Sequence, residues 1–314
     1  MTNARAGLKS CEFEVQEELW AATAICAFEP DWNERKECLS DASDERSEKR
    51  DECRDVFDAR RELCEQTNPG PYAPDFEPED FDSDFSALTN PNPYMPLGIG
   101  NRWRYESDDG EEIFIEVKSA TKRIEGVTCI TVNDRAEQDG FVIEDTEDWQ
   151  AQAKDGAVHY CGEISRNFEL FEGDDPLLPE LVDVDGSWKV GRDDAKPGIL
   201  MLATPVPGTT YRQEFAFGDA EDAATVLSNA YGYGNGEELD DSVPEALADH
   251  FCANEDCVVT LDFTPLSPGS FERKYYARGV GLFLEVDVEG ESFVPLVECN
   301  FHTLCSGIPD VSSE

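Results

Sequence analysis

The chain has 314 residues, of which 70 are acidic and 25 are basic, so its formal net charge is −45. A field of this sign repels phosphate backbones and anionic lipid headgroups, which argues against nucleic acid and membrane surfaces as partners. Hydrophobic residues make up 39% of the chain, enough for a sizeable core in one large domain with an appendage, or in two domains. The acidity has two interpretations: cation binding, or a solvated surface suited to a saline or extracellular medium.

The sequence contains eleven cysteines and no zinc-type CxxC pair, which favours a disulfide framework over metal clusters. Disulfides imply export, so we expect an extracellular or periplasmic protein. The opening residues hold no uninterrupted apolar stretch, so no signal peptide is visible, and no apolar run reaches transmembrane length. No membrane insertion is therefore expected. The alternative is a cytosolic protein with eleven free thiols.

Residues 1–66 are predicted to form a helical hairpin. From residue 9 onward, apolar residues recur at steps of three and four, the spacing of one buried helical stripe. Glu29-Pro30-Asp31 interrupts the pattern, and Asp31 is a suitable N-cap for the second helix. Asn68-Pro69 follows that helix, and proline cannot continue a helix.

Four cysteines are placed symmetrically in this hairpin. Cys11 and Cys26 have the same spacing as Cys38 and Cys53, and the two pairs are mirrored about Trp32. In an antiparallel hairpin, Cys26 then faces Cys38 and Cys11 faces Cys53, so we predict two disulfides. The alternative is four buried core thiols. Cys64 has no mirror position, so it stays free or pairs elsewhere, with Cys129 or Cys161 as a plausible partner.

Residues 67–101 form a linker rich in proline, acids and single aromatics, a composition that favours extended chain. Residues 102–314 are predicted to form an antiparallel β-domain. Asp-Gly and Glu-Gly turn signals recur from Asp109-Gly110 to Asp155-Gly156, and the last is Glu289-Gly290. A short helix is expected at Ala220 to Leu227, followed by a loop over residues 228–250. The predicted fold class is therefore α+β: a helical hairpin followed by a mainly antiparallel β-barrel or strongly curved sheet.

The central meander yields a candidate ligand site. With two-residue turns at Asp139-Gly140 and Asp155-Gly156, alternation places one apolar set on a single inward face. The set comprises Ile113, Ile115, Val117, Ile130, Val132, Phe141, Ile143, Trp149, Val158, Tyr160 and Ile164. The same register puts Asp134, Asp145 and Arg166 in one inward row, with Glu147 one step away.

Charges rarely lie on an apolar face unless they are paired. Two interpretations of the row of Asp134, Asp145 and Arg166 stay open. Together with Glu147, Trp149 and Tyr160, the row could line a ligand pocket in the mouth of a barrel. Alternatively, Arg166 is satisfied by two aspartates at the rim. General acid/base work by Asp145 and Glu147 is a further possibility.

The opposite face carries Phe114, Val127, Cys129, Val142 and Cys161, which is too apolar for full solvation. We expect the hairpin or the linker to cover it. In this register Cys129 and Cys161 lie two strands apart, with Cα atoms roughly 9.5 Å from each other. A disulfide needs a shorter distance, so these two cysteines are predicted not to bond each other.

Each histidine lies two or three residues before a cysteine, an arrangement that zinc sites also use. No four-ligand set with finger-like spacing forms, so we instead predict that Cys252–Cys257 and Cys299–Cys305 close small loops as disulfides. No metal site or cofactor is predicted. Calcium is conceivable given the acidity, but the DxDxDG loop pattern is absent.

Several segments between roughly residues 90 and 300 resemble a family of uncharacterised exported bacterial proteins. They are NPYMPL at 92–97 with WRY at 103–105, EDTEDWQAQAKDGAVHYCGE at 144–163, PGI at 197–199, YRQE at 211–214 and KYYARGVGL at 274–282. The cysteine-bearing helical segment with its PYAPDFEPEDF linker is similar to the longer members of that family. A tryptophan is usual in the family where this chain has His159. The resemblance implies an exported β-domain and carries no activity, ligand or functional residue.

No nucleophile elbow, phosphate loop or metalloprotease motif occurs. The leading hypothesis is an exported, non-enzymatic β-barrel module that binds a small apolar or lipid-like ligand or has a structural role in the envelope. The alternatives are a hydrolase using inward carboxylates and a calcium-dependent surface protein.

Overall fold

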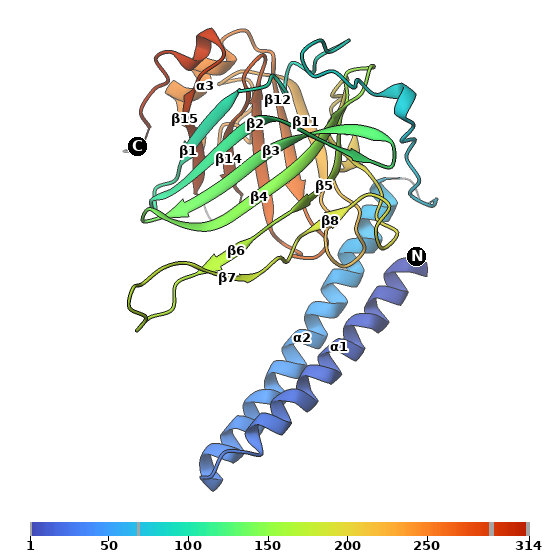
Figure 1. The fold of residues 1–314 in the computed structure, drawn as a ribbon, viewed down its shortest axis with the longest axis vertical. Coiled ribbons are helices and arrows are strands. Elements are labelled where there is room, and N and C mark those ends of the chain that lie inside the picture. Colours follow the sequence, from blue (N-terminus) through green and yellow to red (C-terminus); the bar gives the residue numbers. More distant parts are fainter. Residues whose placement is uncertain (1, 68–69, 289–291, 312–314) are drawn as a thin grey trace. The chain divides into compact units, whose positions relative to one another are not determined.

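The structure is a computed structural model that describes residues 2–67, 70–288 and 292–311 (Figure 1). The chain divides into two compact units. One consists of the residues up to Pro71 with Pro265–Gly269, and the other of the remaining chain from Tyr72 onward. The stretch predicted as a linker therefore belongs almost wholly to the β unit. The expected signals at Asn68-Pro69 and Glu289-Gly290 lie outside the described residues.

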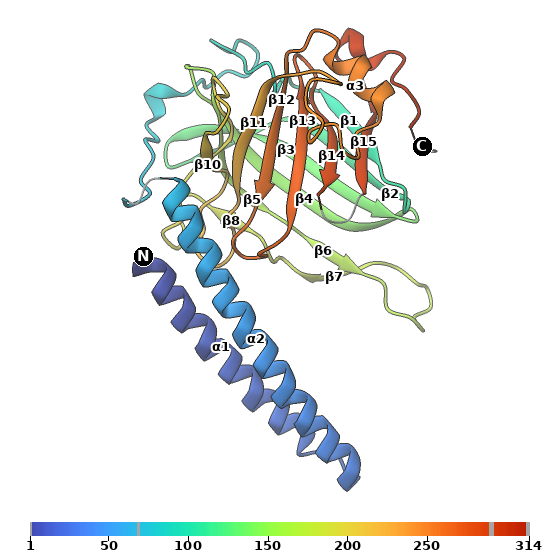
Figure 2. The same cartoon turned by 180° about the vertical axis from the view of Figure 1, so that it is seen from behind.

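The first unit is an antiparallel helical hairpin of α1 (Thr2–Cys26) and α2 (Trp32–Gln66) (Figures 1 and 2). Asp31 caps α2, because its carboxylate accepts hydrogen bonds from the backbone N–H groups of Asn33 and Glu34 at 2.8 and 3.1 Å. The structure contains both disulfides that the mirrored spacing predicts, Cys11–Cys53 and Cys26–Cys38, with Cα–Cα distances of 5.8 and 5.7 Å. Cys64 is a free thiol.

The second unit is built on a large antiparallel sheet (Figure 1). Its first strands are β1 (Arg102–Glu106), β2 (Glu111–Ile124), β3 (Val127–Gln138), β4 (Phe141–Gln152), β5 (Val158–Ile164), β6 (Asn167–Glu169), β7 (Glu180–Asp183) and β8 (Trp188–Lys189). They are followed by β9 (Gly198–Met201), β10 (Thr210–Arg212), β11 (Ala223–Tyr231), β12 (Cys257–Phe263), β13 (Phe271–Ala277), β14 (Gly281–Asp287) and β15 (Phe293–Cys299). The short helices are η1 (Pro78–Asp80), α3 (Glu245–Cys252) and η2 (Thr303–Cys305). The α+β class is confirmed.

The strand order is β10-β11-β12-β13-β14-β15-β1-β2-β3-β4-β5-β8, with β9 also paired to β5. Figure 2 shows this sheet curling from β10 and β11 round to β4 and β5. Near its two ends an isolated bridge joins Lys196 to Phe215. A Cβ on Gly198 would lie 1.7 Å from the Gln213 carbonyl oxygen, so only glycine permits this approach. Within the described residues no continuous ladder closes the sheet into a barrel.

Two secondary-structure predictions were wrong in the second half of the chain. The expected helix at Ala220 to Leu227 is largely strand β11, which pairs with β10 and β12. Tertiary pairing overrides the helical preference of the alanines, and Thr225 and Val226 suit a strand. The expected loop over residues 228–250 contains the start of α3, whose Leu247, Ala248 and Phe251 are buried.

Both faces of the sheet are covered, as the apolar outer face required. The inner core includes Phe85, Tyr94 and Leu97 from the segment predicted as a linker, packed with residues of β1, β2, β3 and β12 to β15. The outer core gathers Phe81 of the same segment with Cys129, Trp149 and Cys161. The linker residues therefore contribute to both cores.

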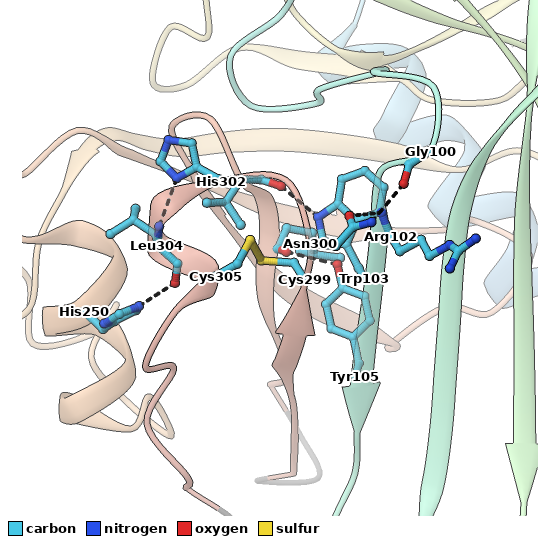
Figure 3. Close-up of a disulfide and its surroundings, with 12 residues drawn as sticks. Gly100, Arg102, Trp103, Tyr105, His250, Cys299, Asn300, His302, Leu304 and Cys305 are labelled. Carbon is cyan, nitrogen blue, oxygen red and sulfur yellow. Dashed lines mark hydrogen bonds between the residues drawn. A yellow bond between two sulfur atoms is a disulfide. The ribbon is translucent and has the colours of Figure 1, made fainter.

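The predicted loop disulfides Cys252–Cys257 and Cys299–Cys305 are also present. Figure 3 shows the second one with its surroundings. His302 accepts a hydrogen bond from Leu304 N–H at 3.3 Å, and His250 bonds the Leu304 carbonyl at 2.8 Å. These two histidines hold the C-terminal segment in place, a structural role that needs no metal ion.

Candidate functional site

A β-bulge decides which residues of β4 face the interior. Next to the turn, Gln138 pairs with Phe141 and Glu137 with Val142, the register expected from a two-residue turn. Ala136 then pairs with Glu144, so Ile143 is an extra residue in β4. After one extra residue, the side chains of the strand that would have faced inward face outward, and the outward ones face inward. The inward set of β4 is consequently Thr146, Asp148 and Gln150.

The bulge separates the row of charges that a regular ladder predicts. Asp134 faces the interior, whereas Asp145, Glu147 and Arg166 lie together on the other face. The Arg166 guanidinium lies 3.7 Å from the Asp145 carboxylate and 3.8 Å from Glu147, and the three side chains are 30 to 46% exposed. The prediction that the row shares one inward face with Asp134 was therefore wrong.

Of the two aromatic candidates, Tyr160 faces the interior and Trp149 does not. Trp149 belongs to the outer core, where the Lys122 ammonium lies 3.2 Å from the centre of its ring. This cation–π contact and the cover supplied by the linker explain how a large aromatic is buried on the outer face. Two of the six predicted ligand-site residues, Asp134 and Tyr160, therefore line the interior.

The prediction about Cys129 and Cys161 was also wrong, because the structure joins them in a disulfide with a Cα–Cα distance of 6.7 Å. The cause is a second bulge. Trp149 pairs with Gly162 but Gln150 pairs with Tyr160, which leaves Cys161 as an extra residue in β5. A bulge bends its strand and increases the local twist. The two Cα atoms thus come closer than the spacing of flat strands allows.

The interior holds a cavity of about 370 Å³ that is lined by strands of the curved sheet and by residues 94–97. This volume lies within the range of small-molecule sites. One part of its wall is apolar or aromatic: Met95, Pro96, Leu97, Trp103, Tyr105, Ile115, Val117, Val132, Leu200, Phe263, Tyr276 and Leu282. Another part carries carboxyl groups: Asp134, Asp148, Glu214, Asp222, Asp262, Glu272 and Glu285. Lys274 is the cation in the described lining.

Lys274 on β13 is surrounded by carboxylates. Its ammonium lies 3.4 Å from Glu272, 3.7 Å from Glu285 and 4.0 Å from Asp262. Burial opposes its charge, but the neighbouring carboxylates outweigh that effect and raise the Lys274 pKa well above its usual value. Burial also raises the pKa values of Asp262 and Glu285, while Lys274 opposes the rise. The single ammonium of Lys274 therefore neutralises part of the charge of three carboxyl groups.

A second polar cluster lies where β4 meets β5. Asp148 and Glu163 are opposite each other across the two strands, and the Tyr160 hydroxyl lies 2.6 Å from Asp148 and 2.7 Å from Glu163. Burial raises the pKa of both carboxyls, and the charge of Asp148 adds to the rise at Glu163. Two buried carboxyls this close favour a state in which they share a proton.

Two lining groups have acceptor capacity without a protein donor. Asp134 has no hydrogen bond or ion pair within the described part of the chain. Gln150 is 7% exposed, and its Oε1 has no hydrogen-bond partner there. Buried polar groups are normally paired. Gln150 Oε1 is itself buried, and buried donors such as the Tyr211 hydroxyl are also unpaired in the described chain, so these atoms do not define a ligand class.

Sequence reasoning missed most of this site: Asp148, Gln150, Glu163, Glu214, Asp222, Asp262, Lys274 and Glu285. One available signal was Lys274, a rare basic residue that alternates with Glu272 and Tyr276 along the segment that forms strand β13. Another was the polar alternation of Thr146, Asp148 and Gln150. Because Trp149 is apolar, the opposite face of β4 was assigned to the interior instead.

Within residues 2–67, 70–288 and 292–311, no group of three or more His, Cys, Asp or Glu side chains is arranged to hold a metal ion. None of the helices in these ranges is long and apolar enough to span a membrane.

No protein-family model matches the chain, and no curated protein is similar to it in sequence. Among solved structures, it is similar to a putative lipoprotein from Parabacteroides distasonis, with 9% identity over 67% of this chain and 100% of that chain, and a TM-score of 0.31. A putative exported protein with a YmcC-like fold from Bacteroides fragilis matches with 11% identity over 68% of this chain and 99% of that one, and a TM-score of 0.25. Likeness at this level carries no argument about function.

Proposed function

We propose that the β unit is a non-enzymatic module that binds a small molecule with an apolar body inside the curved sheet, in a protein exported from the cell. The cavity of about 370 Å³ carries this proposal. Its wall joins an apolar and aromatic part to a polar part with seven carboxyl groups and Lys274. Small-molecule sites combine apolar walls with polar groups that fix the orientation of the ligand. The curvature of the sheet fits this role, because side chains from many of its strands line one common space.

Export is supported by the cysteines. Five disulfides lie in the described chain, three of them in the β unit. Disulfides persist in oxidising compartments and are rare in the cytosol. An extracellular or periplasmic location follows as part of the proposal.

The test is binding of the neutral apolar dye Nile red, followed by its fluorescence. Ile115 lines the cavity and is partly accessible from it. Ile115→Trp should fill the space and weaken dye binding at least tenfold. The matched control is Val206→Trp, since Val206 is 52% exposed and outside the cavity lining. Equal thermal melting of the two variants would show that the fold is retained. Unchanged dye binding by Ile115→Trp would contradict the proposal.

One observation favours a second candidate, hydrolysis by inward carboxylates. Asp148, which lines the cavity, and Glu163, which does not, both contact the Tyr160 hydroxyl, and such a carboxyl pair can serve as general acid and base. A hydrolase of this type would show a bell-shaped pH–rate profile on p-nitrophenyl substrates, lost in Glu163→Gln. The absence of turnover on such substrates would leave the binding role as the better account.

A further inference from the structure

We propose that the β-arm of residues 167–187 is a docking site for an extended, basic segment of another protein, which adds a strand to the free edge of β7. None of the arm residues lines the cavity, so this docking would be a second function of the β unit, separate from the binding of a small molecule.

The arm extends away from the rest of the sheet. It consists of β6, β7 and the loop that joins them, and Figures 1 and 2 show it projecting from the sheet. The pairing of Asn167 with Glu144 joins β6 to β4, whereas β7 pairs with β6. At the base of the arm, Ser165 N–H donates to Ser187 Oγ at 2.9 Å, and the Asn167 amide donates to Asp183 at 2.6 Å. The arm is therefore a formed β-hairpin that is anchored at its base.

One edge of β7 is open. β7 pairs with β6 on one side, and no other strand in the described part of the chain pairs with it. An unpaired edge strand presents backbone N–H and C=O groups that can template a further strand. When an extended peptide is added to such an edge, backbone hydrogen bonds supply affinity and alternate side chains supply specificity. The edge of β7 therefore offers the backbone part of a docking site.

The arm also concentrates exposed apolar side chains. Seven of its large hydrophobic residues are exposed: Leu170, Phe171, Leu177, Leu178, Leu181, Val182 and Val184. The rest of the described β unit has five, at scattered positions. On β7, Leu181 and Val182 point to opposite faces, because side chains alternate along a strand. Clustered exposed apolar residues mark interaction sites, and here they accompany an open edge.

The charge of the arm indicates the kind of partner. Residues 167–187 contain seven acidic residues and no lysine, arginine or histidine. Pairing of β7 with β7 of a second copy would bring Glu180 and Asp183 close to the same residues of the other arm, and like charges across a strand pair are destabilising. Two copies with a net charge of −45 each also repel one another. A strand with lysine or arginine among apolar residues instead complements both the carboxylates and the apolar side chains of the arm.

The experiment is fluorescence anisotropy of a labelled heptapeptide that alternates valine with lysine, titrated with the full chain. Three matched peptides separate the contributions. One has glutamate in place of lysine, one has serine in place of valine, and one has methyl groups on its backbone nitrogens, which removes the donors for strand pairing and keeps the charge. The valine–lysine peptide should bind at least about tenfold more tightly than each of the three, because each lacks the charge, the apolar side chains or the backbone hydrogen bonds.

Two variants test the site on the protein. Leu181→Ser combined with Val182→Ser removes apolar side chains without changing the net charge and should weaken binding of the valine–lysine peptide at least about tenfold. Its matched control is Val206→Ser, since Val206 is exposed and lies outside the arm. Glu180→Lys should weaken binding about fivefold, whereas Glu237→Lys makes the same change of net charge at an exposed position outside the arm and should have less effect. Equal thermal melting would show that the fold is retained.

Each other result would overturn the proposal. If the N-methylated peptide binds as tightly as its parent, or if Glu180→Lys and Glu237→Lys weaken binding equally, only the overall negative field acts. If the chain forms a dimer in sedimentation that the variant with both serines loses, the arm binds a second copy instead. If the arm residues are needed for binding to zwitterionic vesicles and not to the peptide, the partner is a lipid surface. If no peptide binds, the docking site does not exist, and the Nile red test of the cavity is unaffected.

Discussion

Replacing Lys274 with methionine should destabilise the β unit in a pH-dependent way. The Lys274 side chain is 24% exposed and lies within 4.0 Å of carboxylates on Asp262, Glu272 and Glu285. Removing one partner of a buried ionic group typically costs 3–5 kcal/mol. Glu272 is 46% exposed and can be solvated, so the loss should lie at the lower end, about 3 kcal/mol at pH 8.

The pH dependence follows from the two more buried acids. Burial raises the pKa values of Asp262 and Glu285, and Lys274 lowers them, so the substitution raises both further. Ionised carboxylates then destabilise the folded state above those raised values. As the pH falls through them, the groups take up protons and the penalty disappears. The loss of stability should consequently be smaller at pH 5 than at pH 8.

Urea unfolding monitored by tryptophan fluorescence at both pH values measures this effect. Lys118→Met is the matched control, because Lys118 is 38% exposed and pairs with Glu116 on the surface. Such exposed pairs contribute little, so this variant should unfold almost as the parent does. Equal losses at pH 5 and pH 8 for Lys274→Met would refute the reasoning, since they would show that packing of the side chain matters rather than its charge.

Two further predictions concern the outer face. Replacing both Cys129 and Cys161 with alanine should lower the free energy of unfolding by about 2–4 kcal/mol, because the disulfide closes a loop with a sequence separation of 32. Urea midpoints with and without reductant would measure this loss. A double variant as stable as the parent would contradict the prediction. Arg166→Met should lower the free energy of unfolding by less than about 1 kcal/mol, because the ion pairs of Arg166 with Asp145 and Glu147 are part-exposed and longer than 3.5 Å. A loss of about 3 kcal/mol or more would indicate that Arg166 has the buried role expected from a regular ladder.

The helical hairpin could be predicted from sequence because its geometry is local and regular. A helix has one period, so equal cysteine spacings on its two arms are sufficient to pair Cys11 with Cys53 and Cys26 with Cys38. The turns of the sheet could be located for a similar reason, since Asp139-Gly140 suits a tight hairpin. Both kinds of inference use a few neighbouring residues.

The faces of the sheet could not be predicted, because they depend on bulges. Ile143 in β4 and Cys161 in β5 are single extra residues. No special residue type marks Ile143, and the signal for Cys161 is one glycine, Gly162, which has a positive φ in the strand. The alternation of apolar and polar residues also does not identify the inward face, because both faces of the sheet are covered by other parts of the chain. The outer face buries Trp149 and Cys161 beneath the linker segment, so the more apolar side of β4 is not the side of the cavity.

Beyond the bulge, the inner face of β4 is polar where a core alone would favour apolar residues. Asp148 and Gln150 face the interior although apolar side chains would avoid their desolvation. Burial raises the Asp148 pKa, a sign that the folded chain keeps this group at a cost. Such local departures from the packing rules are expected at functional sites.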